Sequence, residues 1–293
     1  DTAKGIALIE EATAQEDRFA LQVLADYLTR GDYVRPEPEL AISLYEKSGN
    51  AGNEWAFVRL AEIYGDGKLV PKDRAKSLDY LRRAEALGLP YASAAIAQGL
   101  LNGKLGKKAD RSEAIKSLKK LAEEGNPHAL LSIANMHYWG NNGFARSPAK
   151  AIALLQAASV EGKVAATRRL ISLYRDGPGQ RMPRSTAKAR AILEERRSQF
   201  NASQYAIEAL LISAAEAYGV RQMENIAESL EVASPAVRLE ALVAMKNVNP
   251  NAFVYVAQRE MKNRGLYSGK LNGQLTSPTI KAIYKLCADS VTA

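Results

Sequence analysis

A repeat of 36 or 37 residues organises the first two thirds of the chain. Glycines that follow alanine-rich stretches stand 36, 37 and 37 residues apart, at Gly52, Gly88, Gly125 and Gly162. A second series in the same phase has spacings of 37, 37, 37 and 36, at Tyr27, Tyr64, Leu101, Tyr138 and Tyr174. Such a period indicates stacked supersecondary units, because one small unit cannot bury its apolar face without neighbours.

Each unit is expected to form two helices, and the clearest unit runs from residue 53 to residue 88. Its first helix should stop at Gly65 to Gly67, since glycine reaches left-handed backbone angles without a Cβ penalty. Asp73 is a candidate N-cap for the second helix, in which Leu78 and Leu81 recur at helical spacing.

The consensus of these units resembles a known repeat. One copy carries it at Ala56, Leu60, Ala61, Tyr64, Gly67, Val70, Pro71, Asp73, Leu81, Ala84 and Gly88. A later copy carries it at Ala129, Ile133, Ala134, Tyr138, Trp139, Gly140, Ala151, Leu155, Ala158 and Gly162. The third copy departs at Leu101 and lacks the Val-Pro pair at 107–110. The pattern resembles the Sel1-like repeat, a relative of the tetratricopeptide repeat. Over residues 1–198 the resemblance implies an all-α, right-handed α/α solenoid whose concave face holds other proteins.

The last third has a different organisation. The repeat register is lost after Phe200, and residues 199–248 are expected to form a helical extension that caps the apolar end of the stack. Helices are predicted over 202–218 and 223–232, and a third should begin at Ser234-Pro235 with serine as its cap.

Residues 249–293 are expected to be a separate small helical module. Two helices, over 253–263 and from Ser277 to near Cys287, should flank a tight glycine-rich loop and pack against the helix that begins at Pro235. The order of motif residues here is Gln258, Gly265, Tyr267, Gly269, Gly273 and Thr279. This order resembles peptidoglycan-binding-like modules, and the resemblance implies contact with the cell wall.

Cysteine and histidine are too few to suggest a metal or nucleophilic centre. His128 and His137 lie nine residues apart on one predicted helix and therefore face opposite ways. The single cysteine, Cys287, has no histidine base in its own module and is expected to be a buried small hydrophobe. We therefore expect no enzyme activity, metal or cofactor.

Charge is distributed unevenly along the chain. The net charge is +8, yet residues 1–60 hold 11 acidic and 6 basic residues. A candidate basic patch lies in residues 168–197, at Arg168, Arg169, Arg175, Arg181, Arg184, Lys188, Arg190, Arg196 and Arg197. It fits either a solvated surface or an anionic partner such as an acidic polysaccharide. Nucleic acid is disfavoured, because no stacking aromatic residues are interleaved with these cations.

Partner contacts are expected at first-helix positions that differ between copies. The candidates are Trp55, Arg59, Tyr91, Gln98, Asn135, His137 and Arg168. Tryptophan, tyrosine and arginine are the residues most often found at energetic hot spots of interfaces.

Together these features favour a non-catalytic scaffold that binds protein partners. By resemblance, its setting would be the periplasm of a Gram-negative bacterium and its task the organisation of envelope machinery such as exopolysaccharide export or assembly. Peptidoglycan or an anionic polysaccharide is a further candidate partner. The alternative is a periplasmic regulator that restrains a signalling protein or a peptidoglycan-cleaving enzyme. No apolar run approaches the roughly 20 residues of a membrane helix; attachment through a removed N-terminal segment stays open.

Overall fold

The protein is built from helices. The computed structural model describes residues 2–31, 34–105, 111–177 and 184–292, and in these ranges every regular element is helical. The prediction of an all-α solenoid is confirmed. Internal contacts divide the chain into two units, residues 1–151 (unit 1) and residues 152–293 (unit 2). The predicted divisions after residues 198 and 248 stay a prediction.

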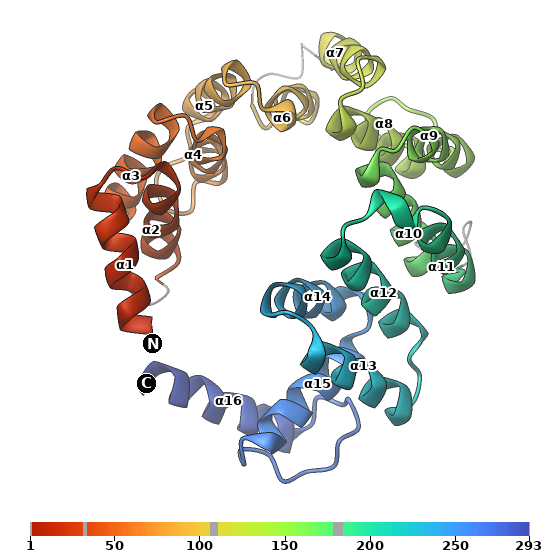
Figure 1. Ribbon diagram of the computed structural model, residues 1–293. Helices are drawn as coiled ribbons and strands as arrows, with labels where there is room; N and C mark the ends of the chain where they lie inside the picture. Colours follow the sequence, from red (N-terminus) through yellow and green to blue (C-terminus); the bar gives the residue numbers. More distant parts are fainter. Residues whose placement is uncertain (1, 32–33, 106–110, 178–183, 293) are drawn as a thin grey trace. The chain divides into compact units, whose positions relative to one another are not determined.

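Unit 1 is a stack of helix pairs. Its helices are α1 (Thr2–Ala14), α2 (Arg18–Arg30), α3 (Pro38–Asn50), α4 (Glu54–Asp66), α5 (Arg74–Ala86), α6 (Pro90–Leu101), α7 (Arg111–Glu123) and α8 (Pro127–Trp139). Each helix packs against the next one in sequence, and α6 also packs against α8. Figure 1 shows α2, α4 and α6 along the inner side of this unit's curve and α3, α5 and α7 along its outer side. The first helix of each predicted pair therefore lies on the inner side.

The helix ends follow the glycine series. The four repeat glycines at 52, 88, 125 and 162 have φ values of 90°, 85°, 90° and 82°, which a side chain would oppose. Gly67, which ends α4, has a φ of 71°, and a Cβ there would lie 2.8 Å from the Cβ of Lys72. Asp73 caps α5 as predicted, since its carboxylate accepts hydrogen bonds from the amides of Ala75 and Lys76, both at 3.0 Å.

The in-phase tyrosine series forms part of the core. Tyr138 is 1% exposed, and Leu101, which replaces tyrosine in the third copy, is 2% exposed. Tyr64 is half-buried and stacks on Tyr80 of the next helix with ring centroids 5.7 Å apart. The period read from the sequence therefore marks packing positions between helices.

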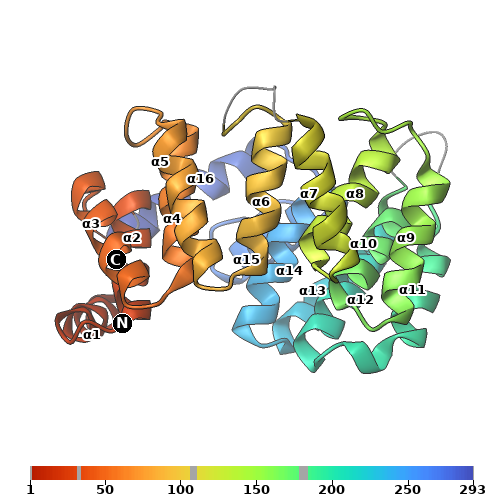
Figure 2. The ribbon, with the colours of Figure 1, turned by 90° about the horizontal axis from the view of Figure 1, so that it is seen from above.

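Unit 2 continues as helices of similar length. Helix α9 (Pro148–Val160) crosses the boundary between the units; the others are α10 (Val164–Asp176), α11 (Thr186–Glu195), a 3₁₀ turn (Arg197–Gln199), α12 (Ala202–Glu216), α13 (Val220–Val232), α14 (Pro235–Val248), α15 (Pro250–Asn263) and α16 (Ser277–Thr292). Figure 2 shows these helices from a second direction. The expected cap of α14 is present, with the Ser234 hydroxyl accepting the amide of Val237 at 3.4 Å.

Four helix boundaries in unit 2 differ from the prediction. Helix α12 ends at Glu216 rather than at residue 218, and α13 begins at Val220 rather than at residue 223. Helix α15 begins at Pro250 rather than at residue 253, because the Asn249 side chain caps it by accepting the amides of Asn251 and Ala252, both at 3.1 Å. The Asn249-Pro250 pair therefore starts this helix. Helix α16 continues to Thr292, beyond Cys287, whose side chain lies outside the described part of the structure.

Candidate partner-binding surface

An aromatic row runs across the first helices of unit 1. Its members are Phe19, Trp55, Tyr91 and His128, which are the second residues of α2, α4, α6 and α8 and follow one another at intervals of 36, 36 and 37. The ring centroids of Trp55 and Tyr91 are 5.3 Å apart, and His128 meets the Tyr91 ring edge-on, also at 5.3 Å. The repeat thus brings together aromatic rings that are far apart in sequence.

The aromatic row is partly open to solvent and bears little charge. Phe19 is 57% exposed and Trp55 45%, while Tyr91 and His128 are half-buried. Burial lowers the pKa of His128. Burial and the nearby Glu62 carboxylate raise the pKa of Tyr91. Both shifts favour uncharged rings near neutral pH, so the row presents an apolar strip.

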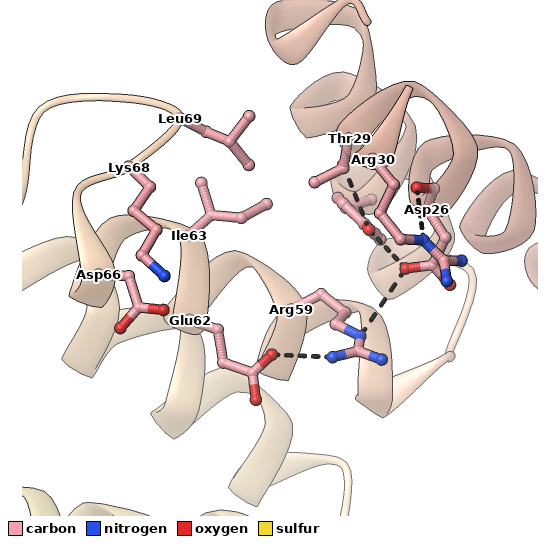
Figure 3. A pocket seen from close by; sticks show the side chains of 10 residues that line it. Asp26, Thr29, Arg30, Arg59, Glu62, Ile63, Asp66, Lys68 and Leu69 are labelled. Atoms are coloured by element: carbon pink, nitrogen blue, oxygen red, sulfur yellow. Dashed lines mark hydrogen bonds and ion pairs between the residues drawn. The ribbon is translucent and has the colours of Figure 1, made fainter. Parts of the chain in front are cut away.

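A small hollow opens between α2 and α4. Figure 3 shows its lining, in which Arg59 lies between two carboxylates and donates to Glu62 Oε2 at 3.0 Å. The Nε of Arg59 lies 3.8 Å from Asp26 Oδ1, and Asp26 also accepts the hydroxyl of Tyr45 at 2.7 Å. Burial and this bond to Asp26 help to raise the pKa of Tyr45 above its ordinary value. The hollow has a volume of about 240 Å³, and Arg59 pairs with two of the carboxylates that line it.

A second hollow, of about 230 Å³, opens between α4 and α6. Tyr91 and the exposed Gln98, which lies seven residues further along α6, both line it. Two turns of helix separate them, so both side chains lie on one face of α6. Glu62 and Asp66 line both hollows. Four of the predicted contact residues, Trp55, Arg59, Tyr91 and Gln98, are thus brought together on α4 and α6.

Asn135 and His137 are placed differently. Asn135 is half-buried on α8. The ring of His137 packs edge-on against Phe144 in the loop that follows α8, with centroids 4.9 Å apart. Its Nδ1 is buried and has no hydrogen-bond partner among the described residues. His137 therefore packs against this loop, whereas His128, which was not among the predicted contacts, joins the aromatic row.

Arg168 lies in unit 2, in a cluster of ion pairs. Its Nε donates at 2.7 Å to Glu208, a carboxylate on α12 that is 3% exposed, and its Nη2 lies 3.4 Å from Glu240 of α14. Arg175, 7% exposed, approaches the second oxygen of Glu208 at 3.7 Å and holds Asp176 through two bonds of 2.7 and 2.8 Å. A buried charge requires such partners, so these two arginines join helices of unit 2.

The predicted basic patch is therefore divided. Arg190 pairs with Glu216 at 2.7 Å, and Arg169 approaches the Ser172 hydroxyl at 3.4 Å. Arg184 and Lys188 are exposed and lie over the rings of Tyr218 and Tyr174 at 5.8 and 5.6 Å. Arg181 lies outside the described residues. Sequence reasoning missed Glu208, because nothing in its local pattern distinguishes a buried glutamate from the many solvated ones.

The motif of the C-terminal module is mainly architectural. Gln258 is fully buried: its Oε1 accepts the amides of Asn272 and Gly273 at 3.0 Å, and its Nε2 donates to Gln274 O and Thr279 Oγ1 at 2.9 Å. The hydroxyl of Tyr267 donates to Lys270 O at 2.9 Å. These bonds hold the loop between α15 and α16.

The glycines of this motif serve the same loop. Gly265 and Gly273 have φ values of 72° and 70°, and a Cβ on Gly273 would collide with the carbonyl of Asn251. A Cβ on Gly269 would lie 2.5 Å from the Tyr267 ring. The expected arrangement of two helices joined by a tight loop is present, and α15 packs against the helix from Pro235.

The described residues form neither a metal centre nor a membrane-spanning helix. No group of three or more histidine, cysteine or acidic side chains is arranged to hold a metal ion in the described ranges. None of the described helices is long and apolar enough to cross a membrane.

Comparison with known protein families identifies repeats in this chain. The Sel1 repeat family matches residues 19–53, 58–89, 90–126 and 127–160. No curated protein matches the chain.

Three solved structures of low sequence identity resemble the chain. The Sel1 repeat protein from Oxalobacter formigenes is 20% identical in sequence to this chain, with a TM-score of 0.40. The matched region covers 80% of this chain and 89% of the Oxalobacter chain. The protective antigen c5321 of uropathogenic Escherichia coli, which displays an SLR fold, is 16% identical over 100% of this chain and 72% of its own, with a TM-score of 0.43. Protein 5086 of Pseudomonas aeruginosa is 22% identical over 78% of this chain and 81% of its own, with a TM-score of 0.47. The family match by itself assigns four consecutive helix pairs between residues 19 and 160 as Sel1 repeats, a class of repeat that mediates protein–protein interaction.

Proposed function

We propose that the chain is a scaffold that binds a protein partner along the first helices of unit 1. The observation that supports this most directly is the aromatic row, in which Trp55, Tyr91 and His128 form a continuous strip across three helices. Exposed aromatic residues that pack on one another lose little conformational entropy on binding and offer a large apolar contact area.

The groups beside the row add specificity. The side chain of Gln98 is exposed and makes no hydrogen bond with another described residue, and Asp66 has no ion pair among these residues, so both can pair with a partner's backbone or side chains. Arg59, Glu62 and Asp26 already satisfy one another. We therefore expect the apolar strip to supply most of the affinity and these polar groups to set the register.

The cellular setting belongs to the same proposal. The resemblance of residues 249–293 to wall-binding modules supports a place in the periplasm of a Gram-negative bacterium. There the chain would organise envelope machinery, with exopolysaccharide export or assembly as the leading task. The alternative is a regulator that restrains a signalling protein or a peptidoglycan-cleaving enzyme; the identity of the bound partner separates the two.

Replacing Trp55 and Tyr91 together with alanine should weaken partner binding by about 30-fold or more, the effect of losing one strong hot spot. The full chain, immobilised, would capture partners from an envelope extract of the source bacterium. Captured proteins would be identified by mass spectrometry, and the affinity of each purified partner would then be measured. Recovery of export or assembly proteins favours the scaffold, and recovery of a kinase or a wall-cleaving enzyme favours the regulator.

The matched control replaces Trp139 and Tyr218, which are 50% and 81% exposed and lie outside the row. This control should bind the partner like the parent chain. Equal binding by the Trp55/Tyr91 variant would show that the row is not the contact surface. Circular dichroism at the assay temperature checks that both double variants remain folded, since Tyr91 is half-buried.

The C-terminal module gives a separate expectation. Its motif side chains Gln258, Tyr267 and Thr279 are buried and bonded within the module, so they are not available to a glycan or peptide. We expect the full chain to sediment only weakly with isolated peptidoglycan sacculi. Strong sedimentation that is lost on replacing the exposed Tyr284 would instead place a wall-binding surface on α16.

A further inference from the structure

An apolar pocket lies in unit 2, and every residue that lines it follows the Sel1 repeats in the sequence. It has a volume of about 560 Å³ and is formed by α13, α14, α15 and α16. Its walls include Leu230, Leu242, Phe253, Val256 and Ile283. Pockets of about 300–1,000 Å³ with mostly apolar walls and a few polar groups are typical of small-molecule sites.

Three arginines and two glutamates line this pocket. Arg259 pairs with Glu231 at 3.0 Å and with Glu224, which lies outside the pocket, at 3.1 Å, and Arg264 pairs with Glu260 at 2.6 Å. The third, Arg238, makes no ion pair with a carboxylate in the described part of the chain.

Arg238 is held instead by the end of α13. Its Nε donates to the carbonyl of Leu230 at 2.9 Å, and its Nη2 donates to those of Glu231 and Ala233 at 2.7 and 3.4 Å. These bonds fix the guanidinium at the pocket and leave its formal charge without a carboxylate counterion. A second ligand of Arg238 would therefore be an anion.

We propose that this pocket binds a single-chain anionic amphiphile of the fatty-acid class. The alkyl chain lies among the apolar walls, where its removal from water drives binding. The carboxylate lies beside Arg238 and receives a charge-assisted hydrogen bond there. This site is independent of the aromatic row and of the proposed protein partner, because every residue that forms it lies in unit 2.

The test is a calorimetric titration of the full chain with monomeric laurate. Binding should be saturable with one site. Octanoate, four methylenes shorter, should bind at least tenfold more weakly, since each buried methylene contributes roughly fourfold in affinity. Dodecyltrimethylammonium, with the same chain and a positive head group, should bind at least about tenfold more weakly than laurate. No saturable laurate binding, or equal binding of the cation, would overturn the proposal.

Variants locate the ligand. Ala257→Phe, which places a ring in the pocket, should abolish laurate binding, and Arg238→Gln should weaken it about tenfold. The matched control is Arg221→Gln, the same change at an exposed arginine of α13 that does not line the pocket; it should bind laurate like the parent. Unchanged binding by Ala257→Phe would show that laurate binds elsewhere. If a variant melts early, the comparison of laurate, octanoate and the cation on the parent chain still decides the question.

Discussion

Tyr138→Ala should destabilise the protein by roughly 3–5 kcal/mol, as expected for the loss of a large, fully packed aromatic side chain. Tyr138 is 1% exposed, and its ring meets that of Trp139 with centroids 5.0 Å apart. Its replacement leaves a cavity that rigid helices cannot easily fill. In stacked repeats each unit is stabilised by its neighbours, so the loss should lower the stability of adjacent repeats as well.

Denaturant unfolding followed by circular dichroism measures this effect. The matched control is Trp139→Ala, which removes the neighbouring ring; because Trp139 is 50% exposed, its loss should cost about 1 kcal/mol or less. Tyr138→Phe should keep most of the packing. If Tyr138→Ala unfolded at the same denaturant concentration as the parent, the in-phase tyrosines would not be packing residues.

Gln258→Leu should lower the stability of the C-terminal module by about 3 kcal/mol, which is the second large effect that we expect. The carboxamide is fully buried and is the acceptor for the amides of Asn272 and Gly273. Leucine leaves these two amides without their acceptor, whereas the Thr279 hydroxyl loses one bond and keeps those to Thr276 and Gln274 O. Each buried group left unsatisfied costs about 1–3 kcal/mol, partly offset where water reaches the loop.

Hydrogen exchange tests this prediction locally. The amides of Asn272 and Gly273 should exchange faster in Gln258→Leu, while amides of the Sel1 repeats should keep their protection. Gln98→Leu makes the same chemical change at an exposed residue of α6 and should alter stability by less than about 0.5 kcal/mol. Unchanged exchange at 272 and 273 would show that Gln258 does not hold the loop.

Local sequence determined the helices and their order. The positive φ that ends a helix is accessible to glycine and costly for most other residues, so the glycine period predicted where helices stop. Caps such as Asp73 and Ser234 act within a few residues of their own position, and both were predicted correctly. The start of α15 was predicted three residues late, at residue 253, because proline fits both a turn and a helix start, and the Asn249 side chain decides between them.

Only part of the candidate binding surface could be predicted from the sequence. Trp55 and Tyr91 were predicted as contacts because copies of the repeat differ at these positions. The same alignment could have added Phe19 and His128, since all four are second residues of first helices. That the rings of Trp55, Tyr91 and His128 touch is a property of the stack, in which equivalent residues of successive repeats lie side by side.

Only the tertiary structure decided which charged side chains have an ion-pair partner. Arg168 and Arg175 read as members of a basic surface, yet both pair with Glu208, which is 40 and 33 positions away in the chain. Arg238, in contrast, makes its hydrogen bonds to carbonyls and has no carboxylate partner among the described residues. Whether a charge is paired depends on which helix packs opposite it. Periodicity indicates which face of a helix is buried but carries no information about the residues of the helix that packs against it. The sequence therefore predicted the repeats and their caps. The ion pairs of the arginines and the pocket of unit 2 became visible only in the packed helices.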